Sequence, residues 1–160
     1  MSEQVELPAA EDTRALGRRL GARLRAGDLV VLTGDLGAGK TTLTQGLGEG
    51  LGVRGPVTSP TFVIARVHPS TTGGPDLVHV DAYRLADGAE LDDLDLDASL
   101  EESVTVVEWG EGLAEVLTQD RLEVLLQRSG SEAAEDQSRR AVLRGRGPRW
   151  AGGVLEGEAP

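Results

Sequence analysis

GDLGAGKT, at residues 34–41, is the stretch of sequence that decides the fold expected for this chain. It follows an apolar run at residues 28–33 that predicts a buried strand, and it precedes a helical pattern at residues 40–51. In that context the pattern G-x-x-x-x-G-K-[ST] predicts a phosphate-binding loop. The alternative, a glycine-rich turn that binds nothing, is disfavoured because Lys40 is the only lysine among the 16 lysines and arginines of the chain.

Each residue type in this loop has its own role in holding a nucleoside triphosphate. The glycines allow the backbone to bend so that successive N–H groups point at phosphate oxygens, and the positive end of the following helix lies beneath the same oxygens. Lys40 is long enough to reach the β- and γ-phosphates, and the Thr41 hydroxyl is placed to ligate Mg²⁺. We therefore expect Lys40 to be catalytic, Thr41 to bind the metal, and the turn to contact ATP through Asp35, Leu36, Gly37, Ala38, Gly39, Lys40, Thr41 and Thr42.

A second apolar run, at residues 104–108, predicts another buried strand that ends in Glu108. A carboxylate at the end of a strand downstream of a phosphate loop holds Mg²⁺ directly or through water, or polarises the attacking water. We therefore predict Glu108 to be both a metal ligand and a catalytic residue.

Two further stretches carry candidate site residues. Asp81 ends a strand-like run and is well placed to hold a metal or a water, whereas His79 in the same run is more typical of a hydrogen-bonded structural histidine than of a catalyst. Thr61 lies on a proline-stiffened turn, at the distance after a phosphate loop where nucleotide-state switch segments occur. An ordinary turn rich in serine and threonine is the alternative for that segment.

The composition sets limits on the remaining possibilities. A chain of 160 residues is expected to form one domain, which we place at residues 1–147, with residues 148–160 as a flexible C-terminal tail. The absence of cysteine excludes disulfides and thiolate metal sites. A formal charge of −11 disfavours direct binding of nucleic acid without a basic partner. Because no apolar run approaches the length of a membrane span, and no signal peptide is recognisable, we expect a soluble, cytoplasmic protein.

The order of strand and helix patterns predicts an α/β fold of the three-layer, P-loop NTPase-like kind. Its sheet is expected to be mixed and mainly parallel, with an antiparallel hairpin formed by residues 62–67 and 76–81. Further strands are expected at residues 120–128 and 139–146, and a first helix at residues 11–27.

Two charged segments leave alternatives open. Residues 87–102 hold eight carboxylates interleaved with leucines, which favours an amphipathic surface segment with a solvated acidic face over a docking surface for a basic partner. Five arginines lie within residues 139–149. They would reach phosphate or RNA in one interpretation and cover a solvated edge strand in the other.

Taken together, four motifs resemble the TsaE family, formerly known as YjeE, over about residues 7–145. They are GDLGAGKTTL at 34–43, SPTF at 59–62, HVDAYRL at 79–85 and VVEWGE at 106–111. The resemblance implies a P-loop α/β fold, weak ATP hydrolysis, and association with the TsaB and TsaD pair that modifies tRNA, so that tRNA itself is met only indirectly. It also implies phosphate and Mg²⁺ binding by Lys40 and Thr41, a Walker B position for Glu108, a requirement for Asp81, and a switch-like segment at Thr61.

The sequence departs from the family pattern at two positions, which are Gly110 in place of a usual proline and Ala82 in place of a usual leucine. Both are backbone or packing changes, so they bear little on the chemistry. A regulatory GTPase is excluded, since its guanine-selecting [NT]KxD element needs a second lysine. A small-molecule or nucleotide kinase stays an alternative, with residues 139–149 as the available arginine-bearing lid.

Overall fold

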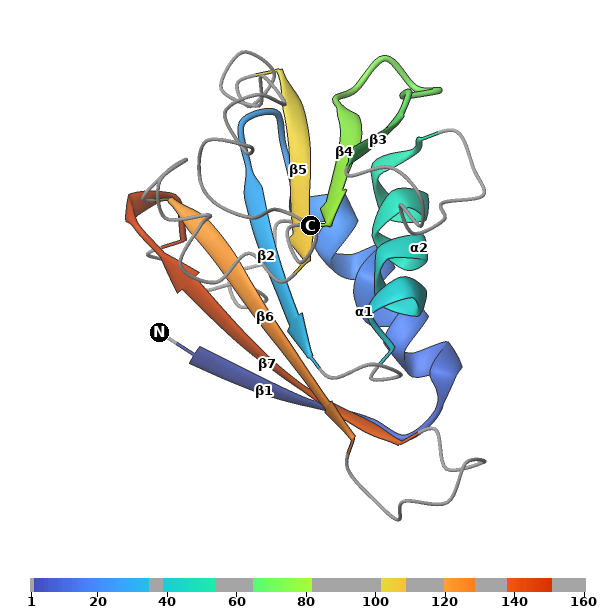
Figure 1. Ribbon diagram of the computed structural model, residues 1–160, viewed down its shortest axis with the longest axis vertical. Helices are drawn as coiled ribbons and strands as arrows, with labels where there is room; N and C mark the ends of the chain where they lie inside the picture. The colour runs from blue at the N-terminus through green and yellow to red at the C-terminus, as the bar shows by residue number, and fades with distance from the viewer. Residues whose placement is uncertain are drawn as a thin grey trace.

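The computed structural model describes residues 2–34, 39–53, 65–81, 102–108, 120–128 and 138–150. These residues form a seven-stranded sheet with two α-helices packed against it (Figure 1). The strands are β1 (Ser2–Leu7), β2 (Leu29–Gly34), β3 (Ala65–His68), β4 (Asp76–Asp81), β5 (Ser103–Glu108), β6 (Arg121–Arg128) and β7 (Arg139–Arg146). The helices are α1 (Ala10–Arg23) and α2 (Lys40–Leu51), and a short 3₁₀ turn, Pro148–Trp150, follows β7.

The strand order is β1-β7-β6-β2-β5-β4-β3. The four central strands β6, β2, β5 and β4 are parallel, whereas β1 and β7 on one side and β3 on the other pair antiparallel. The predicted mixed, mainly parallel sheet and its antiparallel hairpin, β3 with β4, are therefore confirmed. Because parallel strands end at the same edge, the carboxyl ends of β2, β4 and β5 meet there, and β2 leads at that edge into the phosphate loop.

The core lies between the helices and one face of the sheet. Alternate residues of the central strands, such as Val30 and Leu32 on β2, pack in one cluster with Leu16 and Leu20 of α1 and with Leu43 of α2. This alternation places both helices on the same face of the sheet.

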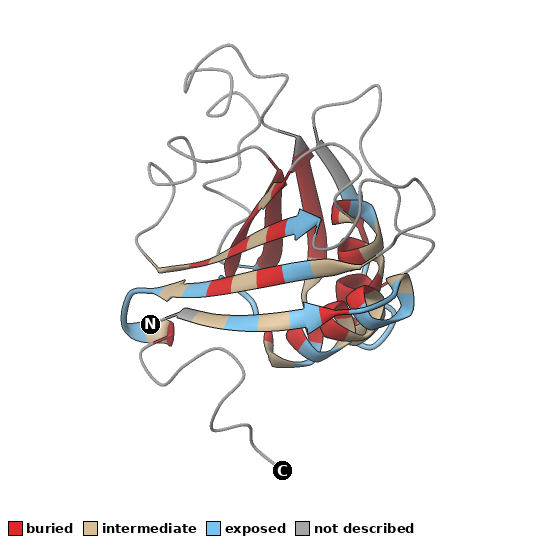
Figure 2. Cartoon of the chain, turned by 90° about the horizontal axis from the view of Figure 1, so that it is seen from below, coloured by how far each residue is buried: buried red, intermediate tan, exposed pale blue. Residues whose placement is uncertain are grey.

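The opposite face of the central strands is buried as well. Leu29, Val31 and Val107 point away from the helices and are at most 4% exposed. Figure 2 shows the middle of the sheet as buried and the outer strands as alternating between buried and exposed residues. Burial on both faces is typical of parallel strands in α/β proteins. The described residues include no helix on this second face, so the third layer stays a prediction.

Helix α1 is shorter than its leucine spacing predicts. Its start is held by the Asp12 carboxylate, which accepts the Ala9 N–H at 2.9 Å. Its end comes at Arg23 rather than Gly27, because Leu24 already adopts an extended backbone. Among the residues described, neither helix is long and apolar enough to cross a membrane.

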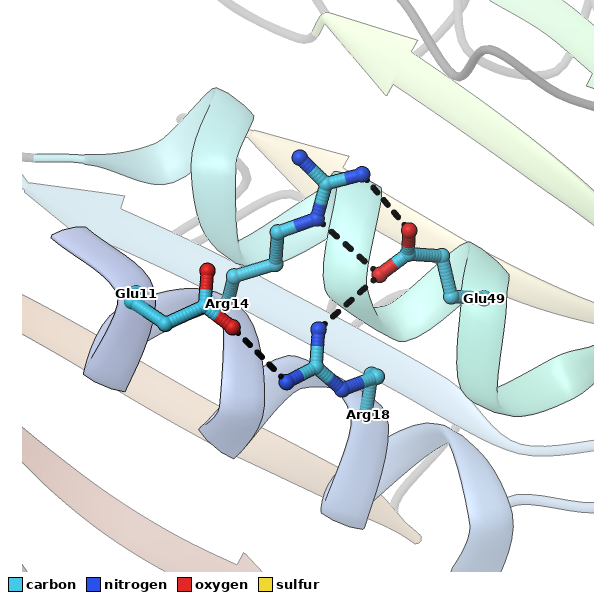
Figure 3. Close-up of polar contacts among 4 residues, drawn as sticks. All are labelled: Glu11, Arg14, Arg18 and Glu49. Atoms are coloured by element: carbon cyan, nitrogen blue, oxygen red, sulfur yellow. Dashed lines mark hydrogen bonds and ion pairs between the residues drawn. The ribbon is translucent and has the colours of Figure 1, made fainter.

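Close contact between the backbones of α1 and α2 fixes the phosphate-loop helix. A methyl group on Gly46 of α2 would collide with the carbonyl oxygen of Arg14 on α1, and one on Gly17 of α1 would collide with the carbonyl oxygen of Leu43. Across the exposed side of the same interface, both Arg14 and Arg18 pair with Glu49 (Figure 3). The two helices therefore form one rigid unit beneath the sheet.

The end of the domain differs from the prediction. Residues 148–150 are not tail: Trp150 is only 2% exposed within the core cluster. Arg149 lies over its ring, 4.2 Å from the centroid, and donates from Nε and Nη2 to the two carboxylate oxygens of Asp28, each at 3.0 Å. One buried aromatic ring and one paired arginine therefore bind this segment to the start of β2, and the domain extends to Trp150. The remainder of the predicted tail lies outside the described residues.

Candidate nucleotide site

The two ends of the predicted phosphate loop are joined by the lysine side chain. Lys40, at the first position of α2, is 7% exposed, and its Nζ donates to the carbonyl oxygen of Gly34 at 2.7 Å. The ammonium group therefore lies beside the last residue of β2, between the two described ends of the loop. Residues 35–38, predicted to contact ATP, lie outside the described residues.

The beginning of α2 is suited to an anion. Gly39 precedes it with a φ of 101°, in the left-handed region that favours glycine, and accepts the first helical hydrogen bond from Leu43 N–H at 2.9 Å. Gly39 has no side chain to cap the helix, and the first turn of α2 contains no acidic residue, so neither of these described parts neutralises its positive end. Thr41 is exposed and Thr42 half-buried in that turn, where both were predicted to contact the ligand.

The predicted acid lies beside the loop strand. Glu108 ends β5, which pairs with β2 so that Glu108 is opposite Leu32, two residues before Gly34. Its side chain is buried and Oε2 lies 2.7 Å from Nε2 of His79 on β4. Asp81 is opposite Glu108 in the pairing of β4 with β5, and only its backbone is described. The strand order therefore brings Glu108 and the backbone of Asp81 to the sheet edge where the phosphate loop begins.

Two residues outside the four sequence motifs also lie near Gly39 of the loop. A methyl group on Gly39 would be 3.7 Å from Cγ2 of Thr13 on α1 and 3.8 Å from Nε of Arg139 on β7. Arg139 belongs to the basic segment that one interpretation of the sequence brings to phosphate, whereas the sequence gives Thr13 no role at the site. No local signal identifies them, because each is brought there by the pairing of β7 with β1 and by the packing of α1 on α2.

The described side chains fit a magnesium–nucleotide ligand better than a metal bound by protein alone. Within the described ranges no group of three or more histidine, aspartate and glutamate side chains is gathered closely enough to hold a metal. Mg²⁺ usually binds through one or two carboxylates, with substrate phosphates and water completing its shell. Glu108 beside a phosphate loop meets that requirement. Thr61 lies outside the described residues.

Comparison with known proteins gives concordant matches. A family model described as Threonylcarbamoyl adenosine biosynthesis protein TsaE matches residues 7–140. The chain is 66% identical over 139 residues to the tRNA threonylcarbamoyladenosine biosynthesis protein TsaE of Streptomyces coelicolor, covering 86% of this chain and 93% of that relative. It is 41% identical over 126 residues to the protein of the same name from Bacillus subtilis, covering 78% of this chain and 77% of the relative.

A solved structure has the same architecture. The crystal structure of YdiB from Bacillus subtilis aligns with a TM-score of 0.71 and 31% sequence identity, covering 93% of this chain and 88% of that chain. The P-loop NTPase-like α/β fold predicted from the sequence is thus found in a related structure as well as in the strand order.

Proposed function

Since the chain belongs to the TsaE family, we propose that it serves the biosynthesis of threonylcarbamoyladenosine in tRNA as a magnesium-dependent ATPase with weak intrinsic hydrolysis. The observation that carries the proposal is the position of Glu108. Its buried carboxylate ends the strand next to β2, and β2 leads into the loop that Lys40 closes through its hydrogen bond to Gly34. A phosphate-binding turn and a strand-end acid on neighbouring strands are the two halves of an ATPase site.

The roles of the individual residues follow from their positions. Lys40 would contribute a positive charge to the phosphates, and the start of α2 would offer backbone N–H groups. Thr41 and Glu108 would hold Mg²⁺, with Asp81 beside Glu108 and Thr61 responding to the bound nucleotide. When bound, Mg²⁺ would neutralise charge on the triphosphate. Thr13 and Arg139, next to Gly39, are available to restrain the ligand from outside the loop.

Substitution of the two principal side chains tests the ATPase. Lys40→Ala should abolish both ATP binding and hydrolysis. Glu108→Gln should keep the affinity for ATP within a few-fold while turnover falls by about 100-fold, because the neutral amide cannot hold the metal or polarise water as a carboxylate does. Calorimetric binding of ATP and a phosphate-release assay measure the two effects separately. Unchanged turnover in Glu108→Gln would remove that residue from the mechanism.

The partners proposed are homologues of TsaB and TsaD, as the family resemblance implies. Slow hydrolysis in a complete phosphate site suits a protein that uses ATP to change its association with other proteins. The net charge of −11 supports contact with tRNA through those partners rather than directly. We expect the cytoplasm as its compartment.

A pull-down tests the partner proposal independently of catalysis. The tagged chain is incubated with TsaB and TsaD in the presence of Mg·ATP, of Mg·ADP, or of no nucleotide. Recovery of TsaB and TsaD should be highest in one nucleotide state. Lys40→Ala should recover, in all three conditions, the amount that the wild-type chain recovers without nucleotide. Equal recovery in all three conditions by the wild-type chain would contradict a nucleotide-dependent association.

A further inference from the structure

One buried polar residue next to the site has no role in the proposed function. His79 on β4 has an exposed fraction of 0%, and its Nε2 lies 2.7 Å from Oε2 of Glu108 on β5, which is itself only 7% exposed. His79 is opposite Val106 in the parallel pairing, so its ring reaches along the strand to the next residue on the same face. Leu77 lies two residues before His79, and Val106 lies two residues before Glu108, so each shares a face of the sheet with that residue. Leu77 and Val106 both belong to the core shared with the helices. The pair therefore faces the layer that contains the phosphate-loop helix.

We propose that His79 is a positioning residue for Glu108, which holds the carboxylate in the orientation that the magnesium–nucleotide site requires. Both side chains are removed from water, so the hydrogen bond is not weakened by solvent and fixes the rotamers of both partners. Oε2 of Glu108 accepts the bond from His79, and in this proposal Oε1 is the oxygen that would meet a metal or a water. The inference rests on the proposed function, since it gives His79 a role only if Glu108 serves that site.

The second ring nitrogen indicates which form of the histidine makes this bond. Nδ1 of His79 is buried and has no hydrogen-bond partner within the described ranges. A proton on Nδ1 would leave a buried donor unpaired, whereas a bare Nδ1 leaves only an unused acceptor. In a neutral ring the proton would therefore be on Nε2 and be donated to Glu108. Ligand carboxylates are commonly held by such outer partners, whose removal lowers metal affinity or activity by about 10-fold to 100-fold.

A purely structural role is the competing explanation, in which His79 only satisfies a buried carboxylate. Two substitutions separate these roles. His79→Leu keeps a similar volume but removes the donor, whereas His79→Gln keeps a neutral N–H that can reach Glu108. The measurements are the affinity for a non-hydrolysable ATP analogue with and without Mg²⁺, the kcat and KM for ATP, and the unfolding temperature of each variant.

The expected result is specific to the metal. His79→Leu should reduce the gain in analogue affinity that Mg²⁺ provides by about tenfold and lower kcat by a similar factor, with affinity in the absence of Mg²⁺ unchanged. His79→Gln should retain most of the gain in affinity from Mg²⁺ and most of kcat. In the nucleotide-free wild-type protein, ¹⁵N NMR of the two histidines should show His79 protonated on Nε2, with His68→Gln used to assign the signals. That spectrum needs neither ligand nor a folded variant of His79.

The outcomes distinguish this inference from the proposed function. If the wild-type chain binds the analogue no better with Mg²⁺ than without it, the proposed function fails. If the wild-type chain shows the gain and His79→Leu shows the same gain at a lower unfolding temperature, the positioning role fails and the residue is only structural. If His79→Leu and His79→Gln lose the Mg²⁺-dependent gain in affinity and kcat to the same extent, the hydrogen bond to Glu108 is not the cause of the loss. A proton found on Nδ1 of His79 would overturn that hydrogen bond as well.

Discussion

Gly39 has a left-handed backbone at the point where the phosphate loop becomes helix α2, and its φ of 101° is a conformation that other residues adopt only at a cost. Gly39→Ala should therefore destabilise the fold by about 1 kcal/mol and weaken ATP binding, because relaxation of the strain moves the N–H groups at the start of α2. Thr13 and Arg139 leave ordinary contact distances for the added methyl, so the backbone, rather than a collision, is the cause. Chemical denaturation and calorimetric titration with ATP measure the two effects.

Gly73 provides the matched control for this change. Its φ is 84° and a methyl group there would meet nothing within 4 Å, in a turn between β3 and β4. Gly73→Ala should cost similar stability without changing ATP affinity. Equal loss of affinity in both variants would show that general destabilisation, and not the shape of the loop, controls binding.

The individual residues of the site were predictable to different degrees. Lys40 and Glu108 are candidates from the sequence because a motif and an apolar strand pattern single them out by local pattern alone. His79 was read as structural, since the sequence does not show that β4 lies beside β5, and only that pairing brings its ring to Glu108. For the same reason the sequence does not show that Arg139 lies near Gly39, which is a hundred residues away, although one interpretation of its basic segment reaches phosphate. Contacts across the sheet depend on strand order, which local periodicity does not contain.

At the scale of secondary-structure elements, the packing of α1 on α2 depends on the absence of side chains at their crossing. Gly46→Ala should destabilise the protein by about 1–3 kcal/mol, because the methyl would press on the backbone of Arg14 and push the helices apart. In an unpacked helix the same change would be stabilising, since alanine is the better helix former. Thermal unfolding measures the difference, with Gly74→Ala as control, where the nearest atom to the added methyl is 3.6 Å away. A stabilised Gly46→Ala variant would contradict this close packing.

The ion pairs on the exposed side of the same helix interface predict a dependence on pH. Hydrogen bonds from Arg14 and then Arg18 lower the pKa of Glu49 from 4.5 to about 2. A carboxyl whose pKa is lowered by folding stabilises the protein fully above its unfolded pKa, and this stabilisation disappears as the pH falls through about 2. Glu49→Gln should therefore lower the unfolding temperature at about pH 6 by less than Gly46→Ala does, with a smaller deficit at about pH 3.

The control for the charge effect is the salt dependence. Because Arg14 and Glu49 are both 41% exposed, about 1 M salt should screen their attraction and reduce the difference between wild type and Glu49→Gln. A difference that grows toward low pH would contradict the assignment of the lowered pKa to Glu49.

For the whole molecule, the element types and the central parallel sheet could be predicted, because each strand and helix carries its own periodicity. The end of the domain could not be predicted from the sequence. Trp150 follows the last alternating strand in a short segment without periodicity, so nothing in its neighbourhood distinguishes a buried ring from a frayed end. The neighbouring Arg149 donates paired hydrogen bonds to Asp28, which is more than a hundred residues away, and only the folded chain displays that link.

Trp150 should accordingly be among the most important residues for global stability. Trp150→Ala removes a ring that is 2% exposed and should cost about 3–5 kcal/mol in the free energy of unfolding. Val67→Ala, at a side chain that is 57% exposed on β3, should change it by about 0.5 kcal/mol or less. Denaturant titration measures both. A loss below about 1 kcal/mol for Trp150→Ala would mean that the segment is the tail that its sequence suggested.

The pairing of β1 with β7 also has a consequence for biosynthesis. Ser2 is aligned with Arg144 and Leu7 with Arg139, so β1, which precedes the other described strands in the chain, finds its neighbour only when β7 has emerged from the ribosome. During translation Val5 and Leu7 therefore have no strand to pair with until β7 has been made, so this edge of the sheet closes only after that. A nascent chain halted before β7 would be long enough to build the phosphate loop, yet it would still lack the neighbour that covers its own beginning.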